Sequence, residues 1–76
     1  MDKAEMILAG LGGADNIEDI EPCITRLRVE ISDDDLVDEA KLTAAGAFGV
    51  VRQPGIVQVV VGPEADTIAA DIEDLM

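Results

Sequence analysis

The alternation of apolar and charged side chains over residues 26–31, RLRVEI, constrains the fold of this 76-residue chain more than any other feature. A period of two places the leucine, valine and isoleucine on one face of a β-strand and the charged residues on the other. Such a strand belongs to a sheet that has one face in water and the other face covered by helices. We therefore expect Arg26, Arg28 and Glu30 on an open sheet face.

Three segments with helical spacing of apolar residues can supply the covering layer. The first begins at Asp2, which with Glu5 resembles a capping box, and ends at the glycines of positions 10, 12 and 13. Its apolar face comprises Ala4, Ile7, Leu8 and Leu11. The second begins after the acidic run 33–35 and ends at Gly46, with one side formed by Leu36, Val37, Ala40 and Ala44. The third begins at Pro63 and carries Ala65, Ile68, Ala69, Ile72 and Leu75.

Extended segments are expected at residues 16–22, 48–52 and 56–61, and a type II turn at Gln53-Pro54-Gly55 joins the last two. The order of elements is then α-β-β-α-β-β-α. Two hairpins joined through a helix predict an α+β fold, with a four-stranded, largely antiparallel sheet and three helices on one face. We expect a single domain over residues 1–76. Because Phe48 is the only aromatic residue, its core must be aliphatic.

Composition excludes several classes of function. The formal net charge of −12 argues against binding to nucleic acid or to anionic lipid, both of which require clustered cations. The chain has no histidine, so it offers neither histidine acid–base catalysis nor histidine metal ligands, and we expect no metal and no cofactor. The lone cysteine, the absence of a secretory signal and the shortness of the apolar run 56–62 predict a cytoplasmic protein without membrane insertion.

The segment 23–28, CITRLR, is the best candidate for a functional site. Two of the five cations, Arg26 and Arg28, lie within five positions of the only cysteine, Cys23. Guanidinium groups bind phosphate through paired hydrogen bonds, and nearby positive charge favours the reactive thiolate. The amides of Ile24, Thr25 and Arg26 can point into one concavity and receive an anion. The alternative is a small buried cysteine beside an ordinary solvated strand face.

Four segments, 12–17, 23–29, 46–51 and 57–62, resemble the enzyme IIB domain of the glucose/N-acetylglucosamine-type bacterial sugar phosphotransferase system. They occur in the same order over nearly the whole chain, and the Cys-x-Thr-Arg-Leu-Arg segment is the most specific of them. The chain departs from the better-known members at Glu21-Pro22, where those carry Asp-Ala. The proline removes an amide donor just before the sulfur.

The resemblance implies a phosphoryl carrier of a sugar phosphotransferase system. In this family the cysteine that matches Cys23 accepts phosphate from a phosphohistidine of enzyme IIA and passes it to a sugar bound in the membrane enzyme IIC. The arginines that match Arg26 and Arg28 act chiefly in the second transfer, and the phosphate loop falls on Ile24 and Thr25. Glucose and N-acetylglucosamine are the leading sugars. The resemblance thus implies a monomer that works at the inner face of the cell membrane when it docks to its permease.

Two other classes of function stay open at this point. A non-catalytic regulatory docking module would use the same fold without phosphoryl transfer. A thiol redox protein is disfavoured because the chain has no Cys-x-x-Cys and no resolving cysteine. Two polar residues also have open interpretations: Gln58 can line a docking surface or be an ordinary exposed residue. Arg52 can extend a positive patch or protect a strand edge.

Overall fold

The segment in which apolar and charged residues alternate forms an inner strand of a sheet that is covered by helices on one face only. The computed structural model describes residues 2–76, and its α-β-β-α-β-β-α order confirms the predicted α+β class. Its elements are α1 (Lys3–Gly10), β1 (Ile17–Cys23), β2 (Arg26–Ile31), α2 (Glu39–Ala44), β3 (Gly49–Gln53), β4 (Ile56–Val60) and α3 (Ala65–Leu75). Two short 3₁₀ turns, η1 (Ala14–Asn16) and η2 (Asp34–Leu36), join them.

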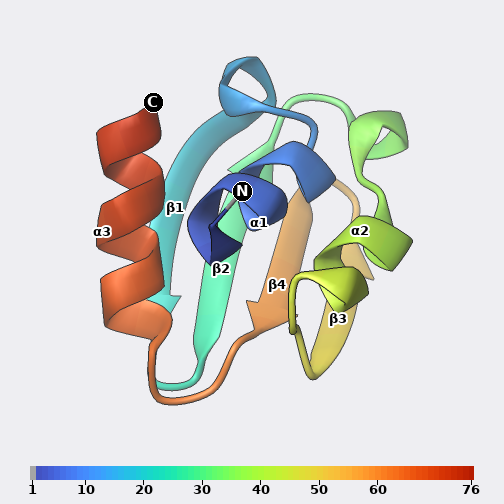
Figure 1. Ribbon diagram of the computed structural model, residues 1–76. Coiled ribbons are helices and arrows are strands. Elements are labelled where there is room, and N and C mark those ends of the chain that lie inside the picture. The colour runs from blue at the N-terminus through green and yellow to red at the C-terminus, as the bar shows by residue number, and fades with distance from the viewer. Residues whose placement is uncertain (1) are drawn as a thin grey trace.

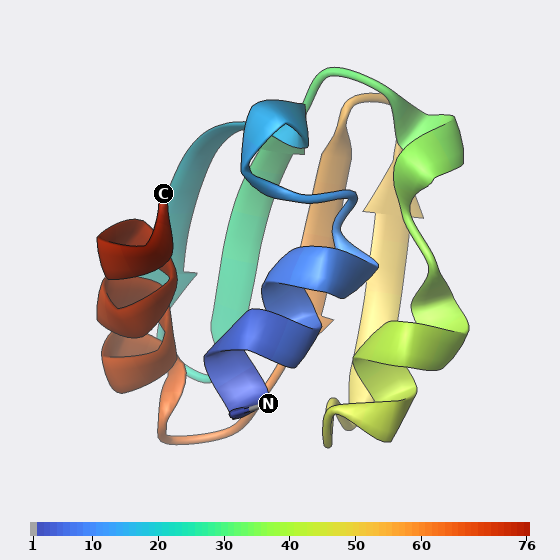
Figure 2. The ribbon, with the colours of Figure 1, turned by 45° about the horizontal axis from the view of Figure 1, so that its top comes forward.

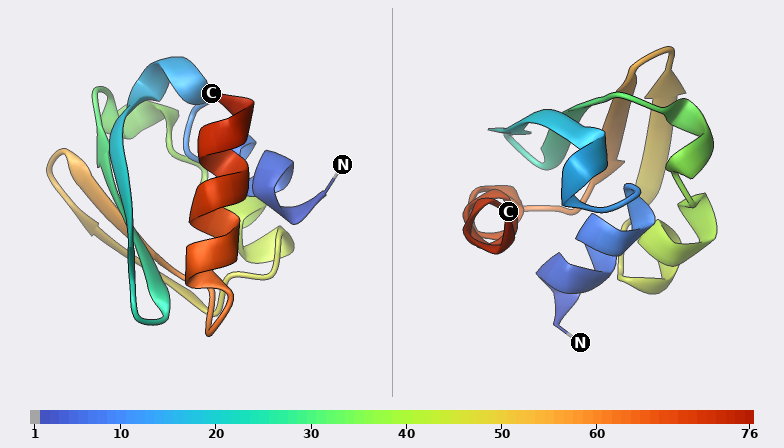
Figure 3. Two further views of the ribbon diagram at one scale, coloured as in Figure 1. Left: turned by 90° about the vertical axis from the view of Figure 1, so that its left-hand side faces the viewer. Right: turned by 90° about the horizontal axis from the view of Figure 1, so that it is seen from above.

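The four strands form one sheet in the order β1-β2-β4-β3, and all three neighbouring pairs are antiparallel. The three helices lie on one face of this sheet, and its other face is left open (Figure 1; Figure 3, left). Helix α1 lies between α2 and α3 in the helical layer (Figure 2). The predicted architecture is therefore confirmed.

The core between the two layers is aliphatic. Leu27 and Val29 of β2 are fully buried, as are Val57 and Val59 of the neighbouring β4. They pack with the buried residues of the three helices in one cluster, because side chains of alternate positions share one sheet face. Phe48 takes no part in the core, since 79% of its surface is exposed.

The second helix is shorter than predicted. The acidic run caps only η2, where the Asp33 carboxylate accepts from the Asp35 amide at 2.9 Å. Helix α2 begins at Glu39 and is capped by Asp38. Between them, Val37 is extended and buried, and the Asp38 amide donates to the Gly10 carbonyl at 2.7 Å, which holds the chain out of the helical path.

This later start changes the face that α2 buries. Ala40 and Ala44 are exposed, whereas Leu42 and Ala45 enter the core, so the predicted apolar side was wrong. The first helix agrees better: the Asp2 carboxylate accepts from the Glu5 amide at 2.9 Å, as the capping pattern predicts. No helix within residues 2–76 has both the length and the apolar character that crossing a bilayer requires.

Candidate functional site

The β1–β2 hairpin presents Cys23 at the end of a strand. Cys23 is the last residue of β1 and pairs with Arg26, the first residue of β2, so the connecting loop contains only Ile24 and Thr25. The thiol belongs to an exposed residue, not to the core. Pro22 lies just before it in an edge strand, a position where proline is tolerated because its missing N–H can face solvent.

The turn after the cysteine is conformationally unusual. Ile24 has φ +58° and is the only non-glycine residue with positive φ in the described part of the chain. Positive φ at only the first residue of a two-residue loop is the pattern of a type II′ turn, where glycine is preferred. A β-branched residue there stores strain of about 1–3 kcal/mol. Two hydrogen bonds hold the turn, because the Thr25 carbonyl accepts from the amides of Val61 at 2.9 Å and Gly62 at 3.0 Å.

Two amides of this turn are free to receive an anion. Among residues 2–76, neither the Ile24 nor the Thr25 amide donates a hydrogen bond to another group of the protein. Free amides in a turn with one left-handed residue are the usual elements of an anion-binding nest. The turn thus offers donors next to the Cys23 sulfur.

Arg26 and Arg28 lie on the open sheet face together with Cys23. Leu27 between them is buried, and the pairing of Cys23 with Arg26 places those two residues on one face. The Arg26 Nη1 donates to Gln58 Oε1 at 3.1 Å, so a neutral partner orients this guanidinium and leaves its charge uncompensated. Arg28 has a distant pair with Glu30, at 3.9 Å between Nη1 and Oε2, and exposed pairs of this kind contribute little.

The neighbouring strand supplies Gln58 from beside the arginines. Gln58 of β4 is the register partner of Arg28, and its side chain reaches along the strand to Arg26. The sequence alone leaves the role of Gln58 open. Its hydrogen bond with Arg26 shows that the Gln58 side chain lies on the open face beside the arginines.

Arg52 does not extend this positive patch. Its Nη1 lies 3.4 Å from Glu39 Oε2 of α2, and its Nη2 donates to the Asp34 carbonyl at 2.6 Å. These contacts turn Arg52 toward the helical layer at the β3 edge. Lys3 and Lys41 belong to helices on that same side, and Arg26 and Arg28 are therefore the two cations of residues 2–76 on the open face.

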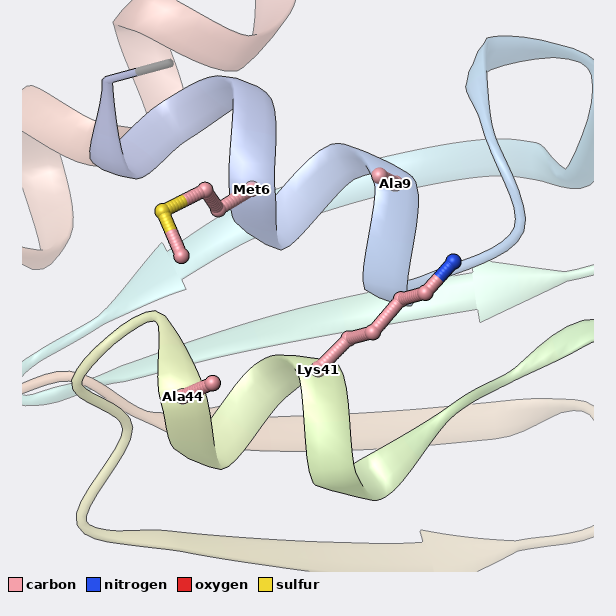
Figure 4. A pocket seen from close by; sticks show the side chains of 4 residues that line it. All are labelled: Met6, Ala9, Lys41 and Ala44. Carbon is pink, nitrogen blue, oxygen red and sulfur yellow. The ribbon is translucent and has the colours of Figure 1, made fainter.

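Two hollows of the surface lie away from the cysteine. One of about 220 Å³ opens between α1 and α2 and is lined by Met6, Ala9, Lys41 and Ala44 (Figure 4). A second, more open one of about 350 Å³ is lined by Glu5, Leu8, Ala9, Gly13 and Leu75. Both are formed by the helical layer. Within residues 2–76, no group of three histidine, cysteine or carboxylate side chains is arranged to hold a metal ion.

Comparison with known proteins identifies the family. Residues 5–38, which include the β1–β2 hairpin, match the family model described as phosphotransferase system, EIIB. The chain is also 64% identical over 74 residues to the PTS system N-acetylglucosamine-specific EIIB component of Streptomyces coelicolor, covering 97% of this chain and 96% of that protein. The chain belongs to the EIIB family of the phosphotransferase system.

Other relatives contain an EIIB region within longer proteins. The PTS system glucoside-specific EIICBA component of Staphylococcus carnosus is 43% identical over 70 residues, which are 92% of this chain but 10% of that protein. A crystal structure of one domain of the PTS system IIabc component from Clostridium difficile matches with a TM-score of 0.80 at 27% identity. That match covers 97% of this chain and 78% of the other. The predicted resemblance to a glucose/N-acetylglucosamine-type EIIB is confirmed, and with it a general phosphotransferase role in sugar transport.

Three features of this end of the molecule could not be recognised from the sequence. These are the left-handed conformation of Ile24, the two hydrogen bonds to the Thr25 carbonyl, and the exposure of Phe48. A two-residue hairpin loop is normally recognised by Asn-Gly or a similar pair, and Ile-Thr contains neither residue. The signal that could have indicated the turn is its position between the extended segment 16–22 and the alternating segment 26–31.

Proposed function

We propose that this EIIB protein, with residues 1–76 acting as one domain, carries a phosphoryl group on Cys23 between two partners. The donor is a phosphohistidine of an EIIA protein, and the acceptor is a sugar bound in a membrane EIIC protein. The observation that carries the proposal is the exposure of the Cys23 thiol at a hairpin end, with Arg26 and Arg28 on the same open face.

In the first transfer, the Cys23 sulfur attacks the phosphorus of the donor phosphohistidine. A phosphorus–sulfur bond forms, the phosphorus–nitrogen bond breaks, and the imidazole keeps the electron pair of the broken bond and takes up the thiol proton. Such a reaction depends on in-line positioning and on stabilising the charge of the transferred group. The free amides of Ile24 and Thr25 would hold the phosphate oxygens after the transfer.

In the second transfer, a sugar hydroxyl oxygen attacks the phosphorus and the phosphorus–sulfur bond breaks. The Cys23 thiolate leaves with the electron pair, and the hydroxyl proton passes to a base of the acceptor protein, since this chain has no histidine. Arg26 and Arg28 would stabilise the negative charge during this step. The Gln58 contact to Arg26 supports this role, because it holds one guanidinium in place beforehand.

The printed names of relatives support the partners and the sugar. The staphylococcal relative is named as a single EIICBA component, so its A, B and C parts work in one system. The Streptomyces relative is named N-acetylglucosamine-specific, which favours this sugar over glucose. We therefore propose a monomeric carrier that meets its EIIC partner at the inner face of the cell membrane.

Intact-mass spectrometry tests the proposal. The protein is incubated with a purified EIIA protein of the glucose-type system that carries phosphate on histidine. We expect a gain of one phosphoryl group whose acid stability differs from that of phosphohistidine. Because Cys23 is the only cysteine, prior alkylation with iodoacetamide blocks one site and serves as the control. A chain that binds the donor but gains no phosphate would instead be a regulatory docking module.

A further inference from the structure

Large apolar side chains are exposed at the end of the molecule that carries Cys23. Ile24 is 89% exposed and Phe48 is 79% exposed, the two highest values among the exposed large hydrophobic residues of the described chain. Pro63 is exposed beside them. A chain with an aliphatic core and one aromatic residue thus leaves that aromatic in water.

The three residues come from three loops that meet at this end. The β1–β2 turn, the segment before β3 and the β4–α3 connection lie together at the bottom of Figure 1 and again in Figure 3, left. Hydrogen bonds join them: the Phe48 amide donates to the Val60 carbonyl at 2.8 Å, and the Gly62 amide donates to the Thr25 carbonyl at 3.0 Å. The Phe48 ring lies over Gly62, where an added Cβ would be 3.1 Å from Phe48 Cε2.

Phe48 lies within one interface footprint of the cysteine. Cys23, Arg26, Val60 and Gly49 are successive register partners across the four strands, and Phe48 directly precedes Gly49. Three strand spacings put the Cα atoms at the two ends of this row roughly 14 Å apart. An interface of standard size covers about 800 Å² of each partner, which corresponds to roughly 30 Å across. A protein that reaches the Cys23 sulfur therefore also covers Phe48.

We propose that Ile24, Phe48 and Pro63 form an apolar docking rim for the EIIA-type phosphoryl donor, with Phe48 as its main anchor. The inference rests on the proposed function. Exposed aromatic residues that become buried on binding often supply a large share of the binding free energy. The Ile24 backbone also favours binding, because its left-handed conformation holds an apolar side chain in solvent before any partner arrives.

Charge favours the donor over the membrane acceptor as the partner of this rim. Cytoplasmic loops of membrane proteins are rich in lysine and arginine. The rim itself carries no charge, so such loops gain no electrostatic attraction from it. The acidic surfaces elsewhere on this chain, whose net charge is −12, would attract them instead. A donor that presents an apolar surface with acidic neighbours fits both the rim and the two arginines.

Phosphoryl uptake measured against donor concentration tests the proposal. The probe is purified EIIA protein carrying phosphate on histidine, and the variants are Phe48→Ala and Ile24→Ala. The control is Leu36→Ala, which truncates an apolar side chain that is 52% exposed in η2, near the opposite end of the sheet. We expect Phe48→Ala to raise the donor KM about tenfold, or ~1.4 kcal/mol, with kcat unchanged. Ile24→Ala should raise it less and Leu36→Ala should leave it unchanged.

A binding titration separates this inference from the proposed function. Unphosphorylated EIIA protein is titrated into the Cys23→Ser variant, with and without Phe48→Ala, so no chemistry occurs. Weaker binding with Phe48→Ala supports the docking rim even if the wild type takes up no phosphate, a result that would overturn only the phosphoryl-carrier proposal. Unchanged affinity and unchanged KM overturn the rim. A defect limited to phosphate delivery in EIIC-containing vesicles assigns the rim to the acceptor and overturns our assignment.

Discussion

The two ends of β1 differ in burial and in the contacts that hold them. At its beginning, Asn16 is 2% exposed and its side chain makes three hydrogen bonds. The amide nitrogen donates to the carbonyls of Leu11 at 2.8 Å and Asp33 at 3.1 Å, and the amide oxygen accepts from the Asp33 N–H at 2.8 Å. At its other end, Cys23 is exposed and Ile24 is strained.

Other contacts strengthen this difference. Near Asn16, Gly12 has φ +103°, and an added Cβ would lie 2.7 Å from Asn16 Nδ2, so only glycine fits there. The Asp34 carboxylate accepts from the Gly55 amide at 3.0 Å and ties η2 to the β3–β4 turn. The Cys23 turn is held by the backbone bonds to the Thr25 carbonyl. The Asn16 end is thus fastened by side chains, which leaves the side chains of the Cys23 end available for a partner.

The largest effect on the Cys23 end should come from Cys23→Ser. A serine hydroxyl is a much weaker nucleophile than a thiolate, so stable labelling by a phosphorylated EIIA protein should fall below detection. Because residue 23 is exposed, the free energy of unfolding should stay within about 0.5 kcal/mol of the wild type. Phosphate incorporation and urea denaturation measure the two quantities. Normal labelling of the variant would show that another residue is the nucleophile.

At the Asn16 end of β1, the largest loss of stability should come from Asn16→Ala. The substitution removes three hydrogen bonds and leaves the buried Leu11 carbonyl and the part-buried backbone groups of Asp33 without these partners, which costs about 3 kcal/mol. For a domain of this size the thermal midpoint should fall by roughly 12–24 °C. The exposed neighbour Asp15 supplies the control, since Asp15→Ala should change little. A loss below about 1 kcal/mol would mean that the Asn16 bonds do not fasten this end.

An intermediate effect is expected from Arg26→Lys and Arg28→Lys. Each variant should still accept phosphate from EIIA, but delivery to sugar should slow about tenfold, since an ammonium cannot reproduce the two-pronged guanidinium contact. The control is Arg52→Lys, in which the altered arginine faces the helical layer. Sugar phosphate formation in EIIC-containing vesicles is the measurement. Wild-type delivery by both variants would remove the arginines from the mechanism.

Sequence patterns predicted the regular part of this molecule well. The alternation over residues 26–31 correctly gives β2, its buried face and the placement of Arg26 and Arg28 in the open. The stripe of the last helix correctly gives α3, although the helix begins at Ala65, after Pro63. Periodicity predicts these elements because each buries one face against the same core.

Features that depend on contacts between distant segments could not be predicted. The late start of α2 results from the bond between the Asp38 amide and the Gly10 carbonyl, 28 residues earlier in the chain. Ile24 is held at positive φ by a turn that is anchored to residues 61 and 62. Local propensity alone disfavours that conformation for isoleucine, so tertiary structure has to impose it.

Ile24→Gly should have the smallest effect of these variants, and its effect on the free energy of unfolding tests the backbone strain at position 24 directly. Glycine removes a conformational cost of about 1–2 kcal/mol at φ +58°, and its greater freedom in the unfolded chain takes back about 0.5–1 kcal/mol. The free energy of unfolding should therefore rise by about 0.5–1 kcal/mol in urea denaturation. The matched control is Thr25→Gly, next in the same exposed loop but without positive φ, which should be destabilised by about 0.5–1 kcal/mol. Equal losses in both variants would mean that the Cys23 turn stores no strain.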